Sequence, residues 1–204
     1  MWQVWDPTLE KNIRFIHPIK TAGTSISDWL GSNYNEIVNW PHQPWYSVPL
    51  PEKPTFTFVV FRNPWDRLES IYWEIGRAIN KKSLPITQEE WNKGFENFVK
   101  IFDDNFFNED ARSKKLEFTR PDGFVIKPWM SQLAHWPKEQ SVHVLNFNNL
   151  DQHWVDMWIS LGVESATSLP HSRHYPHPGS LHTTYTKKVV EKIWPEDVEY
   201  FFKK

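Results

Sequence analysis

Three apolar stretches recur along the chain, and each is followed by a short loop and then by a segment with helical character. They run over residues 12–16, 55–61 and 142–147. The second consists of Phe, Val and Thr, residue types with a strong preference for β-strands. Strands that alternate with helices predict an α/β fold, in which helices cover a parallel sheet.

The segment after the second strand carries the clearest helix signals. Asn63 is a favourable N-cap, and Pro64 suits the first helical position. Apolar residues then recur over positions 68–75 at the spacing of one helix face. The pattern also predicts a helix through Leu30 after the first strand, and a helix over about 151–161 after the third.

The remaining segments carry shorter signals. Thr87 and Glu90 form a capping box for one helix, whose apolar face runs from Trp91 to Phe102. Residues 121–123, Pro-Asp-Gly, predict a turn that joins two short strands. The C-terminal segment is predicted to be helical, with a break at Pro195.

The composition fits a single domain over residues 1–204, because neither a linker nor a repeat interrupts the pattern. Cysteine is absent, which excludes disulfide scaffolds, thiolate metal sites and cysteine nucleophiles. The 23 basic and 25 acidic residues give a net charge of −2 and are interspersed, so we expect no nucleic-acid partner. No run approaches the ~20 apolar residues that span a bilayer, and the first residues do not form a signal peptide. We therefore expect a cytoplasmic protein without membrane contact.

Residues 20–25, Lys-Thr-Ala-Gly-Thr-Ser, stand where the first strand ends and a helix begins. At such a junction the N–H groups of the helix N-terminus attract an anion, and Lys20 adds a positive charge. The loop is not a Walker A motif, because Lys20 precedes the only glycine and no glycine stands upstream in the loop. Taken alone, the pattern fits either an anion-binding loop of another kind or a simple capped helix.

Two stretches resemble the nucleotide-binding motifs of carbohydrate sulfotransferases of the heparan, chondroitin and dermatan O-sulfotransferase type. Residues 15–25 resemble the 5′-phosphosulfate loop, approximately H-I-P-K-T-A-G-T-S, although Pro18 and Ile19 stand in swapped order. Residues 62–72 resemble the 3′-phosphate motif R-N-P-x-D-R-L-x-S-x-Y at every fixed position. The resemblance covers most of the chain and implies the P-loop-like sulfotransferase fold, a three-layer α/β arrangement with a parallel sheet flanked by helices.

The resemblance also implies a sulfuryl donor, 3′-phosphoadenosine-5′-phosphosulfate (PAPS), which leaves as 3′-phosphoadenosine-5′-phosphate (PAP), and it implies no metal. Lys20 would neutralise the bridging oxygen as the S–O bond breaks. The 5′-phosphate would be held by the loop residues Thr21, Ala22, Gly23, Thr24 and Ser25. Arg62 and Ser70 would hold the 3′-phosphate, and Arg173, in a His- and Pro-rich loop over residues 170–179, is a further expected phosphate contact.

Activation of an acceptor hydroxyl requires a general base. We expect His42 to be that base, because it lies between the two motifs, where sugar-modifying relatives carry a catalytic histidine. Glu36, in the same segment, is the alternative. Trp40, Trp45 and Gln132 are predicted to contact the acceptor, a carbohydrate or related hydroxyl compound. The net charge favours a neutral or lightly charged saccharide.

Two other functions stay open. A chain with 13 tryptophans could be a non-catalytic glycan-binding protein, because exposed indole rings stack on sugars. A small-molecule kinase is the third alternative, and the missing Walker A motif counts against it. The histidines of the 170–179 loop follow no standard helix-borne ligand spacing, so we expect no metal site there.

Overall fold

The computed structural model describes residues 1–39, 55–78, 86–119, 125–135, 141–163, 167–170 and 180–203. The chain forms two compact units, each assembled from two separate stretches. Unit 1 comprises Met1–Arg62 and Gln132–Pro176, and unit 2 comprises Asn63–Ser131 and His177–Lys204. No single cut in the sequence separates the units, and the assignment of residues 1–204 to one domain stays a prediction.

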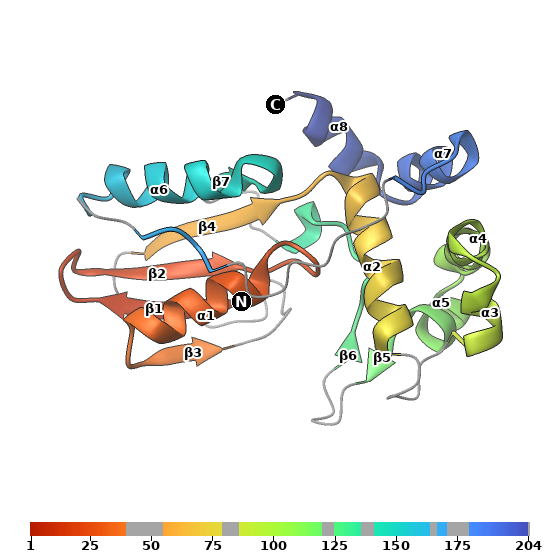
Figure 1. The fold of residues 1–204 in the computed structure, drawn as a ribbon, viewed down its shortest axis with the longest axis horizontal. Coiled ribbons are helices and arrows are strands. Elements are labelled where there is room, and N and C mark those ends of the chain that lie inside the picture. The colour runs from red at the N-terminus through yellow and green to blue at the C-terminus, as the bar shows by residue number, and fades with distance from the viewer. Residues whose placement is uncertain are drawn as a thin grey trace. The chain divides into compact units, whose positions relative to one another are not determined.

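Unit 1 contains a mixed five-stranded sheet in the order β3-β1-β2-β4-β7, so the protein is of the α/β class with a sheet flanked by helices (Figure 1). The strands are β1 (Trp2–Asp6), β2 (Lys11–Ile16), β3 (Ile37–Asn39), β4 (Thr55–Phe61) and β7 (His143–Asn146). β2, β4 and β7 run parallel, which confirms the three strands that the apolar stretches predict. β1 is antiparallel to both of its neighbours, so the expectation of a purely parallel sheet is wrong.

The antiparallel part of the sheet begins with the hairpin between β1 and β2. Asp6 Oδ1 accepts hydrogen bonds from the main-chain N–H groups of Thr8 and Leu9, at 2.9 and 3.0 Å. Glu10 completes the turn with a positive φ of 51°. A turn this short joins antiparallel strands only. β1 escapes prediction because only two of its residues are buried, so its sequence lacks the apolar run of a core strand.

The main core of unit 1 lies on one face of this sheet. Helices α1 (Gly23–Asn33) and α6 (Leu150–Ser160) pack there against the strands. The largest buried side chains of this core are Phe15, Phe58, Trp154 and Trp158. The Phe15 and Phe58 rings stack with their centroids 5.0 Å apart. A good part of the high aromatic content is therefore core of unit 1. Among its described residues, unit 1 also contains the 3₁₀ turns η2 (Leu133–His135) and η3 (Phe147–Asn149).

Unit 2 is mainly helical. Its elements are α2 (Pro64–Ala78), α3 (Gln88–Asn92), α4 (Phe95–Phe106), α5 (Glu109–Leu116), β5 (Phe118–Thr119), β6 (Val125–Ile126), α7 (Thr184–Ile193) and α8 (Pro195–Lys203). The predicted capping box of Thr87 and Glu90, the pair of short strands and the break at Pro195 are confirmed. The single helix expected after Thr87 is wrong, because Gly94 adopts a φ of 90° and divides it into α3 and α4.

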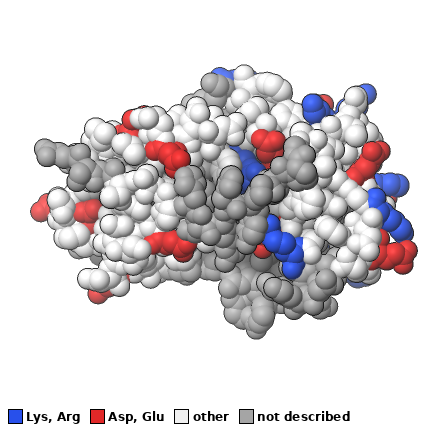
Figure 2. Space-filling view, viewed as in Figure 1, with Lys and Arg blue, Asp and Glu red and all other residues white. Residues whose placement is uncertain are grey.

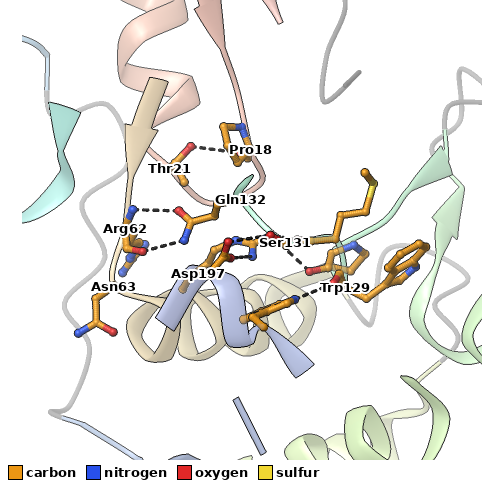
Figure 3. Close-up of polar contacts among 12 residues, drawn as sticks. Pro18, Thr21, Arg62, Asn63, Trp129, Ser131, Gln132 and Asp197 are labelled. Carbon is orange, nitrogen blue, oxygen red and sulfur yellow. Dashed lines mark hydrogen bonds and ion pairs between the residues drawn. The ribbon is translucent and has the colours of Figure 1, made fainter. Parts of the chain in front are cut away.

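Unit 2 contains a fully buried ion pair. The guanidinium of Arg67 lies 3.7 Å from the carboxylate of Asp197, and both side chains are fully buried. Arg67 Nη2 also donates to Met130 O at 2.7 Å, and the guanidinium lies 4.4 Å from the centre of the Trp194 ring. Ser131 Oγ donates to Asp197 Oδ1 at 2.7 Å (Figure 3). Buried charges persist where such partners satisfy them, so Arg67 has a structural role.

Removal of the Tyr34 hydroxyl should destabilise unit 1. Tyr34 is the C-cap residue of α1, and its hydroxyl donates to Asp6 Oδ2 at 2.7 Å, which joins α1 to the β1–β2 turn. Tyr34→Phe removes this bond and should lower the free energy of unfolding by about 1–2 kcal/mol, measured by urea denaturation. Tyr185→Phe is the control, because the Tyr185 hydroxyl makes no hydrogen bond within the described part of the chain. Equal stability of wild type and Tyr34→Phe would contradict the assigned bond.

The same contact predicts a loss of stability at alkaline pH. Burial, followed by the hydrogen bond and charge of Asp6, raises the pKa of Tyr34 far above its ordinary value of 10.0. The unfolded chain therefore releases this proton at a lower pH than the folded chain. The stabilisation is complete below about pH 10 and decreases as the pH rises further. The stability difference between wild type and Tyr34→Phe should thus be constant near neutral pH and shrink above about pH 10.

Candidate functional site

The loop between β2 and α1 has a backbone conformation that suits an anion. Lys20 and Ala22 have positive φ angles of 67° and 61°, whereas Thr21 and Gly23 do not. Alternation of this kind turns successive N–H groups toward a common hollow, a nest, which binds phosphate in other proteins. A positive φ costs a residue with a side chain about 1 kcal/mol, and such strain concentrates at functional sites. The geometry therefore supports an anion site at this loop.

The N-terminus of α1 adds to the positive character of the loop. Ala22 is the N-cap residue, and its side chain cannot cap the helix. The N–H groups of the first turn, from Gly23 to Ser25, have no acceptor within the helix. The first turn carries no acidic residue, so no carboxylate there competes with a bound anion.

Packing contacts fix the loop in this conformation. Thr21 is fully buried, and its Oγ1 donates to Pro18 O at 2.8 Å (Figure 3). The imidazole of His17 stacks on Phe15, with 5.3 Å between ring centroids, and lies directly against Gly23. A Cβ atom at position 23 would come within 1.7 Å of His17 Nε2. Glycine is therefore required at this position because of the space that His17 fills.

Arg62 reaches the loop from the neighbouring strand. It directly follows β4, which runs parallel to β2, so both strands end at the same edge of the sheet. Arg62 Nη1 donates to the main-chain oxygen of Lys20 at 3.3 Å. The guanidinium also lies 4.3 Å from the centre of the Phe147 ring, at the end of β7. The structure thus brings Lys20 and Arg62, one residue from each motif, into direct contact.

Gln132 binds the main chain of Arg62, as Figure 3 shows. The N–H of Arg62 donates to Gln132 Oε1 at 2.9 Å, and Gln132 Nε2 donates to the carbonyl oxygen of Arg62 at 2.8 Å. The Gln132 side chain is fully buried. In the structure the amide of Gln132 holds the end of β4, and its predicted contact with the acceptor stays a prediction.

The second motif also forms the beginning of α2 in unit 2. Asn63 caps this helix as predicted, because its Oδ1 accepts from the N–H of Trp65 at 3.0 Å. Glu69, further along the helix, accepts from the main-chain N–H of Leu181 at 3.2 Å. Ser70 is buried on the same helix, and its contact with a 3′-phosphate stays a prediction.

The strand register places Glu36 away from the loop. Ile37 pairs with Val4, which in turn pairs with Ile13, three residues before the end of β2. At about 3.3 Å per residue, Glu36 lies roughly 10 Å or more along the strands from the edge where the loop begins. From this point β3 runs toward that edge, in the same direction as β2, and ends at Asn39, level with Phe15. This geometry disfavours Glu36 as a general base.

Four of the residues predicted for the site lie outside the described residues: Trp40, His42, Trp45 and Arg173. The sequence also missed two residues that shape the described part. His17 belongs to the first motif, so the motif indicated its position, but nothing in the sequence assigned it a role. Phe147 ends the third predicted strand, but nothing in the sequence signalled its contact with Arg62, because that contact arises only when β4 and β7 pair.

Charge on the surface is mixed in sign. On the face that Figure 2 shows, acidic side chains are spread across the view among uncharged ones, whereas the basic side chains lie toward its centre and right. Among the described residues, no group of three or more His, Asp or Glu side chains could hold a metal ion. Within the same residues, no helix combines the length and the apolar character needed to cross a membrane.

No protein-family model, curated protein or solved structure matches this chain. The candidate site therefore depends on the residues and the geometry of the chain itself.

A side chain at position 23 should displace His17 and disturb the loop. Gly23→Ala places a Cβ where the imidazole lies, so we expect a loss of about 1–3 kcal/mol in the free energy of unfolding. The double variant Gly23→Ala/His17→Ala removes the clash and should be more stable than the sum of the two single changes predicts. Thermal and urea unfolding of the four proteins measure this coupling. Strict additivity would show that His17 and Gly23 do not share this space.

Proposed function

We propose that this protein is a sulfotransferase that moves a sulfuryl group from PAPS to a hydroxyl group of a carbohydrate or related acceptor. The observation that carries the proposal is the nest at Lys20–Gly23, bonded to Arg62 through the Lys20 carbonyl. Residues 15–25 and 62–72 resemble the two donor-binding motifs, and this resemblance indicates PAPS as the ligand of the nest. The proposal includes the three-layer, P-loop-like sulfotransferase fold.

The proposed chemistry is an in-line displacement at sulfur. A bond forms between the acceptor oxygen and sulfur, and the bond between sulfur and the bridging oxygen of the 5′-phosphate breaks. The electron pair stays on that oxygen, so PAP leaves with an added negative charge. The N–H groups of the nest hold the 5′-phosphate, and the Lys20 ammonium group stabilises the charge that develops on the leaving oxygen. As in phosphoryl transfer, positioning and charge stabilisation supply most of the rate.

The acceptor hydroxyl must lose a proton during this displacement. We propose His42 as the general base, because histidine titrates near neutral pH and His42 follows Asn39 by three residues in the sequence. Asn39 ends β3 level with Phe15, close to the edge where the loop leaves β2. Glu36 stands at the start of β3, further from that edge, which favours His42 over Glu36.

Lys20→Ala should separate transfer from donor binding. The wild type should gain thermal stability with PAP, by about 2.7 kcal/mol at one hundred times Kd, and should release a sulfated product from PAPS. Lys20→Ala should lower kcat about 100-fold or more, with a smaller effect on PAP binding, because the lysine acts mainly on charge that develops in the transition state. Lys11→Ala is the matched control, since Lys11 is exposed at the opposite end of β2. Product mass across saccharide and small-alcohol acceptors gives the readout.

Three outcomes of this experiment decide between functions. No stabilisation of the wild type by millimolar PAP would overturn the sulfotransferase proposal. Saccharide binding without any PAP effect would favour a glycan-binding protein, and stabilisation by ATP that depends on Mg²⁺ would favour a kinase.

Replacement of each candidate base by alanine in turn should identify which residue is the general base. His42→Ala should lower kcat about 100-fold or more while PAP affinity stays within about threefold of the wild type. Glu36→Ala is the paired variant and should leave both quantities unchanged, because Glu36 is exposed and distant from the loop edge. A normal kcat for His42→Ala, together with a slow Glu36→Ala enzyme, would reverse the assignment.

A further inference from the structure

A fully buried glutamine completes the hydrogen bonding of the chain just beyond β4. The pairing of β4 with β7 ends at Phe61, so the ladder does not extend to Arg62. Gln132 supplies both missing partners, because its amide oxygen accepts from the Arg62 N–H and its amide nitrogen donates to the Arg62 carbonyl, at 2.9 and 2.8 Å. A buried main-chain group without a partner is costly. The Gln132 amide therefore fixes the direction in which the Arg62 side chain leaves the sheet.

Two further contacts fix the guanidinium of Arg62. The Phe147 ring lies 4.3 Å from the guanidinium carbon, and the Lys20 carbonyl accepts from Nη1 at 3.3 Å. Stacking on an aromatic face and a directed hydrogen bond together restrict a side chain that otherwise has many rotamers. All four residues belong to unit 1, although they come from separate segments of the chain. Arg62 is thus held at both its main chain and its side chain.

We infer that Gln132 and Phe147 are positioning residues that orient Arg62 and thereby set selectivity for a nucleotide with a 3′-phosphate. The inference rests on the proposed function, in which Arg62 binds that phosphate. A guanidinium fork discriminates well only when it is held in the geometry that matches the phosphate oxygens. If its orientation is lost, the charge remains but the preference for a 3′-phosphorylated nucleotide falls. Gln132 and Phe147 act on that preference without touching the nucleotide.

The ratio of affinities for PAP and adenosine 5′-monophosphate (AMP) tests this inference. The two nucleotides share the adenosine and the 5′-phosphate and differ in the 3′-phosphate, so the ratio isolates recognition of that group. Calorimetry should show tight PAP binding and weak AMP binding in the wild type. Gln132→Met keeps the approximate volume but removes both bonds to Arg62. It should lower PAP affinity about tenfold and change AMP affinity less than about threefold.

A mutant cycle distinguishes positioning from a general structural effect. In an Arg62→Ala background, Gln132→Met should not lower the PAP-to-AMP ratio further, because the side chain that it orients is absent. Tyr34→Phe is the matched control, since it removes a partly buried hydrogen bond in the same unit without contacting Arg62. Its ratio should equal that of the wild type even though the protein is less stable.

Phe147→Leu provides a second test that does not depend on Gln132. The change keeps an apolar side chain but removes the aromatic face, so the PAP-to-AMP ratio should fall about two- to fivefold. If Gln132→Met does not fold, this variant decides alone, and an unchanged ratio overturns the inference.

The failures of the two proposals are distinguishable. A wild type that does not prefer PAP over AMP overturns the donor site and, with it, the proposed function. A wild type that prefers PAP, with a Gln132→Met variant that keeps the full ratio, overturns only the positioning roles.

Discussion

The candidate site depends on how the chain is held at the point where β4 ends. Among the residues that the structure describes, no strand pairs with Arg62 beyond Phe61, so the main chain there needs other partners, and the buried amide of Gln132 provides them. The side chain of Arg62 donates to the Lys20 carbonyl in the neighbouring loop. Gln132 thereby holds the end of β4, and through Arg62 it connects this strand to the strained loop that contains Lys20.

That loop contains two strained residues, and the core behind it offsets the cost. Lys20 and Ala22 each adopt a positive φ without being glycine. The one glycine nearby, Gly23, has an ordinary φ and serves instead to make room for the His17 ring. His17 stacks on Phe15, and Phe15 stacks on Phe58, so a column of rings runs from the core of the sheet to the first turn of α1. Packing of this kind can retain a backbone conformation that the local sequence disfavours.

The sequence predicted those strands and helix caps that depend on residues close together in the chain. It did not predict contacts between residues that are distant in the chain. The three parallel strands, the Asn63 cap and the Thr87 capping box follow from residues within a few positions of one another. The hairpin strand β1 was missed because it is half-buried and lacks an apolar run. The break at Gly94 was missed because the apolar spacing continues across it. The roles of Gln132 and Phe147 arise only from tertiary pairing, which no spacing along the chain reports.

The unpredicted antiparallel strands also bear on the chemistry. β1 runs antiparallel to both β2 and β3, so β3 runs in the same direction as β2 and ends level with Phe15, beside the edge that carries the Lys20 loop. If β1 were parallel to β2, a long crossover would have to join the two strands, and the short hairpin avoids that length. The chain therefore returns to the loop edge at Asn39, only a few residues before His42 in the sequence. The same register leaves Glu36 about four residues short of this edge, which is the physical reason to place the proton acceptor after β3 rather than before it.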